Sequence, residues 1–473
     1  MKLKSLILAG VTGLLTLSGC SKFLEEKSQS EVIPKTAIDY RELLIGSGYM
    51  NNSEPMNMVY FMDDDVDLFI EYANGQESPV GQYDAKYNYL TYTWQPKQAD
   101  MNGVGDYISE DPANTPYAGY YKWIMGCNAV LENIDNAIGS DKDKARVKAE
   151  ALAVRAFYYF RLANLYGEPY NYHPQSLCVP LKLNSGMTDK PLNQNTVQEV
   201  YDQVVSDLKL AASLMDPLPI VRKDYHINQP AIHILLSRVY LYMEKYNEAV
   251  EEANKVFDQG GVLADLTAME ASAWLTYANP EVEWLFGGNT QPNQSTYVPA
   301  PAFRASFDPA DVRITKGIQV QPATFTPLVI KLPTGADLGQ TLRTPEALLN
   351  RAEAYVQLGK LSEAVADLNN LRRKRIPGYA DIAVTDKATL LLAVREERRK
   401  EFCFENFRWF DLRRYGMPSI THRYQHELGE PILQYKLAEK DPAYTLPFAT
   451  SLLTRNPALK QNPSGMAPDR IGQ

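Results

Sequence analysis

Residues 237–257 read SRVYLYMEKYNEAVEEANKVF, and residues 352–372, which lie 115 positions further along, read AEAYVQLGKLSEAVADLNNLR. The two stretches align without a gap and share six identical positions, including a tyrosine, a lysine and a Glu-Ala-Val run. In each stretch an aromatic residue precedes a tight turn at Glu244 or Gly359, and Glu-Ala then opens a second helical pattern. Each stretch therefore predicts a pair of antiparallel helices, whose small alanine permits close packing.

The repeated pattern resembles the tetratricopeptide repeat. Such a helix pair cannot bury its apolar face alone, so we expect several pairs to stack into a curved array. A further pair is predicted at Thr196–Met215 and Gln229–Met243, where Thr196 and Glu199 form the pattern of a capping box. The predicted fold class is all-α, a superhelix of tetratricopeptide-like helix pairs with irregular, loop-rich insertions.

The longest periodic segment is Asp143–Tyr166, where apolar residues recur every third or fourth position. This period predicts a long amphipathic helix, and Tyr120–Ala137 has the same pattern and would be its partner. Gly167 and Pro169 end the long helix, because glycine permits a left-handed cap and proline cannot continue a helix.

Two segments interrupt the helical pattern. Residues 60–123 contain ten tyrosines together with Trp94 and Trp123, and residues 290–345 contain eight prolines. Irregular segments on a rigid scaffold commonly carry binding function, and tyrosine suits a wet recognition surface. We expect these two loop-rich segments to form the ligand face.

The composition is that of a globular protein that is not strongly basic. The chain has 473 residues, a net charge of −9, 45% hydrophobic residues and 22% charged residues. Its densest basic runs, 372–375 and 395–400, lie within helical patterns. Nucleic-acid binding needs a basic patch, so we expect no nucleic-acid partner.

The N-terminus has the features of an export signal. A basic start is followed by an apolar run from Leu6 to about Ser18, which is too short for a membrane-spanning helix. The run ends in Leu-Ser-Gly-Cys20, which resembles the lipobox of bacterial lipoproteins; the alternative is an ordinary secretory signal with an accidental cysteine. We expect a signal peptide at 1–19, lipidation of Cys20, a tether at 20–35 and one folded domain at 36–473.

Few patterns indicate a metal site, a cofactor or catalysis. The three remaining cysteines, Cys127, Cys178 and Cys403, form no CxxC pair, and we expect buried, inert thiols. The acidic run 63–67 lacks the glycine and final glutamate of a calcium loop, which favours a solvated turn. Neither an HExxH motif, a GxSxG elbow nor a phosphate loop is present, so we expect no metal, no cofactor and no enzyme. A pair of distant carboxylates of the glycosidase type stays open as an alternative.

Six motifs in order resemble the SusD/RagB family of outer-membrane nutrient-uptake lipoproteins. They are the lipobox at Cys20, residues 121–134, residues 153–169, the helix pair 348–375, residues 395–416 and the C-terminal residues 446–463. The resemblance covers nearly the whole chain and implies four tetratricopeptide-like pairs. It also implies a lipid-anchored, surface-exposed protein of the outer membrane that captures a glycan and passes it to a SusC-like, TonB-dependent transporter. Capture of peptides, and a protein scaffold without a small ligand, are the alternatives.

The ligand contacts are expected in the two loop-rich segments, where the resemblance places the family's sugar-binding aromatic residues. Sugar binding needs an aromatic platform flanked by planar polar groups. We expect Tyr92 and Trp94 to form the platform on one side of an extended stretch, with packing in the core as the alternative for Trp94, and Asn102 to supply a hydrogen bond. From the second segment we add Tyr297 and Arg304.

Five charged residues lie among aromatic residues of the helical motifs: Arg155, Glu401, Arg408, Asp411 and Arg413. An unpaired buried charge is very costly, so we expect these residues to form structural ion pairs and not to contact the ligand.

Overall fold

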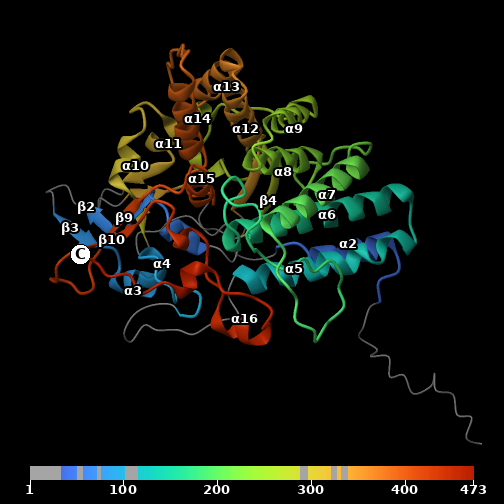
Figure 1. Ribbon diagram of the computed structural model, residues 1–473. Helices are drawn as coiled ribbons and strands as arrows, with labels where there is room; N and C mark the ends of the chain where they lie inside the picture. The colour runs from blue at the N-terminus through green and yellow to red at the C-terminus, as the bar shows by residue number, and fades with distance from the viewer. Residues whose placement is uncertain are drawn as a thin grey trace, which may run out of the picture.

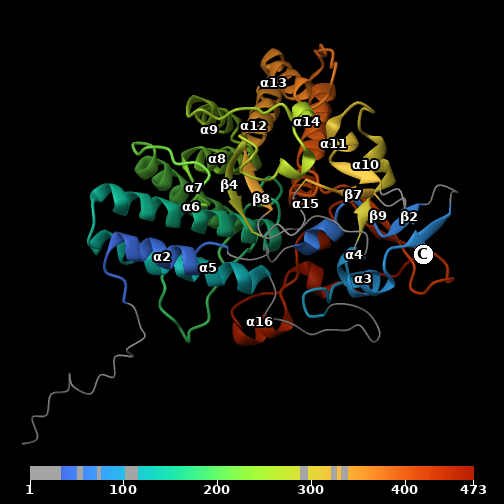
Figure 2. The same ribbon diagram turned by 180° about the vertical axis from the view of Figure 1, so that it is seen from behind.

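The computed structural model describes residues 33–50, 57–71, 76–101, 116–287, 297–320, 327–331 and 339–473. Long helices follow one another in an arc along one side of the molecule, and most of the short strands lie on the other side (Figures 1 and 2). The predicted all-α fold with tetratricopeptide-like helix pairs is confirmed.

Each long helix of the array packs against the next one in the chain: α2 on α5, α5 on α6, α6 on α7, α7 on α8, α8 on α9, α9 on α12, α12 on α13 and α13 on α14. Their bounds are Ala37–Ser47 (α2), Pro116–Leu131 (α5), Asp141–Tyr166 (α6), Val197–Met215 (α7), Gln229–Tyr242 (α8), Tyr246–Asp258 (α9), Thr344–Gln357 (α12), Leu361–Arg373 (α13) and Lys387–Glu401 (α14). Stacking of this kind buries the apolar face that each pair leaves open.

The long helix α6 begins and ends for identifiable reasons. The Ser140 side chain accepts a hydrogen bond from the backbone N–H of Asp143, which satisfies one free donor of the first turn. Gly167 ends the helix with φ −103°, so the predicted left-handed cap is wrong. Glycine is needed there for space, because an added Cβ would lie 2.7 Å from the Val197 side chain and 2.8 Å from Cys178 Sγ.

The two repeated stretches form the helix pairs α8–α9 and α12–α13. Their turns adopt the same left-handed backbone conformation, with φ +58° at Glu244 and φ +77° at Gly359. Ala249 and Ala364 are fully buried, as close helix packing requires. The aligned positions of the sequence are therefore equivalent positions of the fold.

Short elements complete the fold. The shorter α-helices are α3 (Gln82–Tyr87), α4 (Tyr89–Tyr92), α10 (Pro301–Ala305), α11 (Val312–Thr315), α15 (Arg408–Arg414) and α16 (Thr450–Arg455). The 3-10 helices are η2 (Asn57–Phe61), η5 (Ile134–Asn136), η6 (Leu266–Ala268), η7 (Ala271–Ala273), η8 (Pro442–Tyr444) and η9 (Pro463–Met466).

The strands form antiparallel pairs: β1 (Val66–Asp67) with β5 (Val298–Pro299), β2 (Phe69–Glu71) with β3 (Glu77–Pro79), β4 (Val282–Phe286) with β8 (Gln340–Arg343), β6 (Ile318–Val320) with β7 (Pro327–Val329), and β9 (Ile420–Tyr424) with β10 (Leu433–Leu437). The pair β1–β5 joins the two loop-rich segments directly, through Val66 opposite Pro299 and Asp67 opposite Val298. Segments more than two hundred residues apart in the sequence are thus paired directly.

A buried ionic network attaches the second loop-rich segment to the helical array. It consists of five basic and five acidic side chains from α11, β8, α13, α14 and the neighbouring loops: Arg313, Lys331, Arg343, Arg372 and Arg375 with Glu281, Asp311, Glu397, Glu401 and Glu405. Equal numbers of opposite charges in contact offset the large desolvation cost of burying each one.

The three cysteines of the folded body, Cys127, Cys178 and Cys403, are free and buried. Burial raises the pKa of Cys127 and of Cys178 to about 12, so both stay protonated and unreactive at neutral pH. The expectation of buried, inert thiols is confirmed. In the described part of the chain, none of the helices has the length and apolar character needed to cross a bilayer.

Candidate functional site

The two loop-rich segments meet at a contact that we call the junction, formed by residues 60–67 and 297–304. Beside the β1–β5 pairing, the backbone N–H of Ala300 donates to Asp65 O at 2.8 Å. The rings of Tyr60 and Tyr297 stack with centroids 6.1 Å apart, and Phe61 meets Tyr297 edge-on at 4.9 Å. The two loop-rich segments are therefore in direct contact, and their role as a ligand face stays a prediction.

The acidic run in the junction is held by arginines and is not a solvated turn, so that expectation is wrong. Asp63, Asp65 and Asp67 are buried. Arg408 from α15 binds Asp64 through two hydrogen bonds, with Nε at 2.6 Å and Nη2 at 2.7 Å. Arg399 from α14 binds Asp65 with Nε–Oδ1 2.6 Å. The remaining member, Asp67, pairs with Arg423 from β9 (Nη2–Oδ2 2.7 Å). The described residues contain no grouping of three or more histidine, cysteine or acidic side chains suited to a metal ion.

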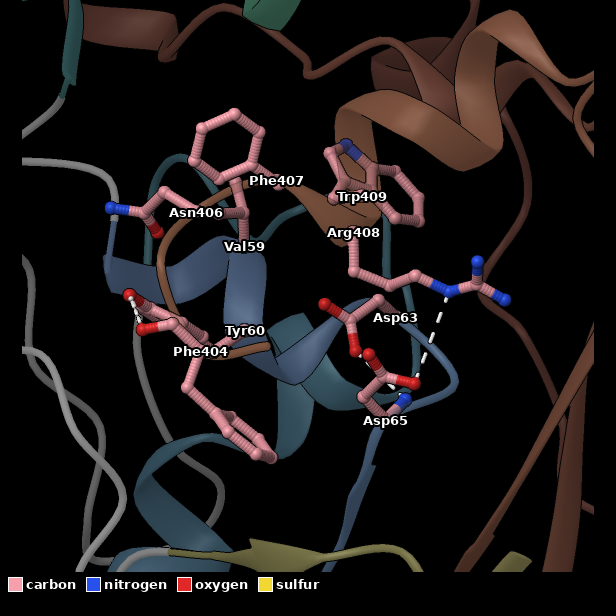
Figure 3. Close-up of a pocket in the computed structure, with 9 residues that line it drawn as sticks. All are labelled: Val59, Tyr60, Asp63, Asp65, Phe404, Asn406, Phe407, Arg408 and Trp409. Atoms are coloured by element: carbon pink, nitrogen blue, oxygen red, sulfur yellow. Dashed lines mark hydrogen bonds and ion pairs between the residues drawn. The ribbon is translucent and has the colours of Figure 1, made fainter. Parts of the chain in front are cut away.

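A small cavity lies beneath this turn (Figure 3). Its volume is about 10 Å³, which is room for a single water molecule. The lining side chains are Val59, Tyr60, Asp63, Asp65, Phe404, Asn406, Phe407, Arg408 and Trp409. Figure 3 shows the carboxyl groups of Asp63 and Asp65 next to each other, with Arg408 extending past them. A sugar ring is far larger than this space, so the cavity is not the ligand site.

The charge state of the three neighbouring carboxyl groups follows from their surroundings. Burial, together with the charges of Asp65 and Asp64, raises the pKa of Asp63 well above its ordinary value. Burial also raises the pKa of Asp65 to about 6, although Arg399 and Arg408 oppose the rise. Burial would also raise the pKa of Asp64, but the hydrogen bonds and the charge of Arg408 outweigh burial and lower the pKa of Asp64. Asp64 is therefore the charged, more accessible member of the group.

The predicted platform residues Tyr92 and Trp94 lie in the core, where each is 1% exposed. The stretch is not extended, because Tyr92 ends helix α4 and Trp94 has φ +52°. The two rings enclose His422, each with its centroid 4.2 Å from the imidazole, and Trp94 Nε1 donates to Met62 O at 3.0 Å. Burial lowers the pKa of His422 to about 4, although two backbone carbonyls oppose the shift. In this conformation the pair packs inside the protein and presents no open ring face to a ligand.

The other predicted ligand residues have different positions. Tyr297 is buried in the junction against Tyr60 and Phe61. Arg304, on α10 directly after β5, is half-buried, and its Nε, which is shielded from solvent, has no hydrogen-bond partner among the described residues. Arg304 is therefore a half-buried charged group at the edge of the junction. Asn102 and the lipidation residue Cys20 lie outside the described residues.

Three of the five predicted ion-pair residues pair as follows. Arg155 from α6 binds Asp207 of α7 with Nε–Oδ2 2.8 Å. Glu401 is shared by three guanidinium groups of the buried network, those of Arg313, Arg343 and Arg375. Arg408 binds Asp64, as described above, so its role is to hold the junction turn.

The last two predicted ion-pair residues differ from each other. Asp411 accepts hydrogen bonds from Arg398 at 2.9 Å and from Arg414 at 2.8 Å. Arg413 forms no ion pair with a described residue, which corrects the expectation for it. Its guanidinium donates instead to the backbone carbonyls of Asn164 and Gly167 at the end of α6. Burial without a carboxylate partner lowers the pKa of Arg413 to about 10.

Sequence reasoning missed a cluster of rings between α4 and the β9–β10 hairpin. Tyr89 and His426 are its half-buried members, and Tyr424 and Tyr435 are buried behind them. The Tyr435 hydroxyl lies 3.2 Å from the Tyr89 hydroxyl and 2.9 Å from His426 Nε2. Tyr89 lies in the tyrosine-rich segment, but its partners come from a strand pattern more than three hundred residues away, and no local signal connects the two.

Two family descriptions match the chain. Residues 22–241 match the family described as "Starch-binding associating with outer membrane", and residues 335–464 match the SusD family. No curated protein matches the chain.

Solved structures from Bacteroides resemble the whole chain. A putative sugar binding protein from Bacteroides vulgatus is 25% identical with a TM-score of 0.73, and the match covers 92% of this chain and 99% of that one. A SusD superfamily protein from Bacteroides thetaiotaomicron is 23% identical with a TM-score of 0.71, covering 90% and 100%. A SusD-like carbohydrate binding protein from Bacteroides vulgatus is 21% identical with a TM-score of 0.67, covering 90% and 97%. The latter two show the likeness of the fold alone.

Proposed function

The chain belongs to the SusD/RagB family, and on that premise we propose that it captures a glycan at the outer membrane and delivers it to a TonB-dependent transporter. Proteins of this family are associated with the outer membrane, and similar structures include a putative sugar binding protein. Lipidation of Cys20 would hold the protein at the membrane, and a SusC-like transporter would be its partner.

The observation that carries the proposal is the junction. Two loop-rich segments from distant parts of the sequence are joined there by β1 and β5. The neighbouring elements β2 and α10 lie on the side of the molecule away from helices α2, α5, α6 and α7 (Figure 1). Such irregular segments, fixed by a rigid helical array, are the common arrangement of a binding surface.

The polar groups at the edge of the junction suit the hydroxyl groups of a sugar. Asp64 offers carboxylate oxygens, and the half-buried Arg304 offers its guanidinium group. Planar charged groups of this kind form strong, directional hydrogen bonds with a ligand. We propose that Arg304 and Asp64 contact the glycan and that Arg399 and Arg408 hold the turn that carries Asp64.

We propose that the protein binds without catalysing a reaction. The carboxyl groups with raised pKa, Asp63 and Asp65, resemble an acid pair, but they border a cavity with room for one water molecule. A glycosidic bond has no access to such a pair, because retaining and inverting mechanisms both place the bond between two carboxyl groups several ångströms apart.

Calorimetric titration tests the ligand class. Soluble protein starting at Ser21, which lacks the lipidated cysteine, is titrated with neutral glycans, acidic glycans and peptides, alongside the Arg304→Ala variant. Loss of a charge-assisted hydrogen bond is expected to weaken glycan binding by about tenfold. The matched control is Arg373→Ala, which removes an exposed arginine on the distant helix α13 and should leave the affinity unchanged.

The alternatives predict other results. Saturable binding of peptides alone would replace the glycan by a peptide ligand. Release of reducing ends, abolished by a substitution in a carboxylate pair, would show an enzyme. Failure to bind any nutrient polymer, together with retention of a membrane protein in pull-down experiments, would favour a scaffold. The transporter partnership itself is tested by co-purification of a TonB-dependent transporter with the lipidated protein.

A further inference from the structure

Three exposed isoleucines lie together where the described chain begins. The exposed fractions are 62% for Ile33, 71% for Ile38 and 69% for Ile138. The backbone of Ile138 lies beside residues 35–37, which stand between Ile33 and Ile38 in the chain, because Thr36 and Ile138 form a parallel bridge, in which the Ala37 N–H donates to Ile138 O at 2.8 Å and the Ile138 N–H donates to Lys35 O at 2.9 Å. We call these three side chains the isoleucine patch.

The backbone beneath the patch is fixed. Thr36 and Asp39 form a capping box at the start of α2, which sets the direction of Ile38. Gly139 packs so closely on Ala37 that an added Cβ would lie 2.9 Å from the Ala37 Cβ. The patch is therefore presented by a rigid surface, and its exposure is not that of a frayed chain end.

The place of the patch in the chain points to its partner. Cys20 lies 13 residues before Ile33, and a fully extended chain of this length reaches about 45 Å at most. Lipidation of Cys20 would hold the start of α2 within that distance of the bilayer. Once the anchor is inserted, contact between the patch and the membrane is an intramolecular step, so that even a weak interaction is populated.

We propose that the isoleucine patch inserts into the lipid bilayer beside the anchor and so sets the orientation of the protein on the membrane. The proposal rests on the lipid anchor of the proposed function. Aliphatic side chains gain free energy when they enter the boundary between headgroups and acyl chains. The charged residues around the patch are four acidic and two basic, a net charge of −2: Lys35, Asp39, Glu42, Asp141, Lys142 and Asp143. Such a surface does not attract anionic lipid, so the attraction to the bilayer is apolar and added salt should not weaken it.

Fluorescence quenching in vesicles tests the proposal. The full-length, lipidated protein carries bimane on the Lys35→Cys variant, since Lys35 is exposed beside the patch and the three native thiols of the body are buried. The vesicles contain equal parts of phosphatidylethanolamine and phosphatidylglycerol with bromine on the acyl chains. Flotation with the vesicles reports anchoring, and quenching of the label by bromine reports contact of the patch with the bilayer.

The variant Ile33→Ser, Ile38→Ser, Ile138→Ser removes the patch. Its control is Leu392→Ser, Leu428→Ser, Ile471→Ser, which replaces three similarly exposed apolar side chains elsewhere. We expect quenching at low and high salt in the parent and the control, and loss of quenching in the patch variant while it still floats.

Each other outcome contradicts the proposal in a different way. A protein that floats without quenching, or a patch variant that is quenched as strongly as the parent, overturns insertion of the patch but leaves the anchor intact. A protein that does not float with the vesicles is not held by a lipid anchor. That result would contradict both the membrane attachment of the proposed function and the role of the patch. Loss of transporter co-purification in the patch variant, without quenching in the parent, would show that the patch contacts the transporter and not lipid.

Discussion

At the level of single residues, the same backbone conformation is adopted by two different residue types. Glu244 and Gly359 occupy equivalent turns of the repeated helix pairs, and both have positive φ. A side chain with a Cβ is disfavoured in this region, whereas glycine adopts it readily. The turn between α8 and α9 is therefore strained, and the turn between α12 and α13 is not.

The substitution Gly359→Ala is expected to lower the free energy of unfolding by about 1 kcal/mol, because alanine must adopt the left-handed conformation. Nothing lies within 4 Å of the added Cβ, so the effect comes from the backbone alone. Chemical denaturation measures it. The control is Gly46→Ala in helix α2, where space is also open and alanine favours the helix, so stability should not fall. Equal losses in both variants would contradict this account of the turn.

Trp94 shows a residue whose role depends on burial. Its indole stacks on His422 and fills space in the core. We expect Trp94→Ala to lower the free energy of unfolding by about 3–5 kcal/mol, as removal of a buried aromatic side chain does. Thermal unfolding checks this, with Tyr172→Ala as the control because Tyr172 is exposed. A stable Trp94→Ala variant that loses only glycan affinity would instead support a ligand platform.

At the level of elements, helix α14 connects most of the fold through charge. Its residues Glu397 and Glu401 contact arginines from α11, β8 and α13, while Arg399 reaches the junction turn. The pKa of Glu401 is well below its ordinary value, because Arg375 and Arg343 outweigh the effect of burial. Glu401 is therefore ionised, and its loss would leave several guanidinium groups without a full partner.

The substitution Glu401→Gln is expected to cost about 3–5 kcal/mol of stability, since breaking a buried ion pair leaves an uncompensated charge. Asp381→Asn is the control: it removes an ion pair to Arg373 in which both side chains are about half exposed, and such exposed pairs contribute little to stability. Urea denaturation compares the two. A loss below about 1 kcal/mol for Glu401→Gln would show that the network does not hold α14 in place.

At the scale of the whole molecule, the buried carboxylates make stability depend on pH. Burial would raise the pKa of Glu353, but the charges of Arg414 and Arg395 lower it to about 2. Its folded pKa lies below its unfolded value, so its contribution is present above about pH 4.5 and is lost as the pH falls toward 2. The pKa shift of Asp65 has the opposite sign. Its folded pKa of about 6 lies above its unfolded value, so stability rises as Asp65 becomes protonated below about pH 6.

The difference in free energy of unfolding between the parent and Glu353→Gln is therefore expected to be constant from pH 7 to about pH 5 and to shrink as the pH falls further. Denaturation at a series of pH values measures this difference. Glu439→Gln is the control, because Glu439 is exposed and its substitution should change stability little at any pH. A difference that persists undiminished below pH 4 would contradict the lowered pKa.

The sequence by itself determined the helical architecture. Apolar periodicity located α6 to α8 within two residues and placed α5 four to six residues too far along the chain, and the internal repeat identified α8–α9 and α12–α13 as equivalent pairs. These features are local, because a helix is specified by residues three and four positions apart. The same reasoning located the two loop-rich segments by composition, although it did not show that β1 and β5 join them.

The tertiary structure alone decided which side chains face the core and which face a counter-ion. Tyr92 and Trp94 belong to a composition typical of binding sites, but His422, which lies between their rings, comes from a strand more than three hundred residues away. From the sequence alone the acidic run 63–67 is predicted to be solvated, because Arg399 and Arg408, which bind it in the folded protein, lie far away in the sequence. Burial and charge pairing depend on partners that are distant in sequence and near in space. The periodicity of a single segment does not indicate which residues these partners are.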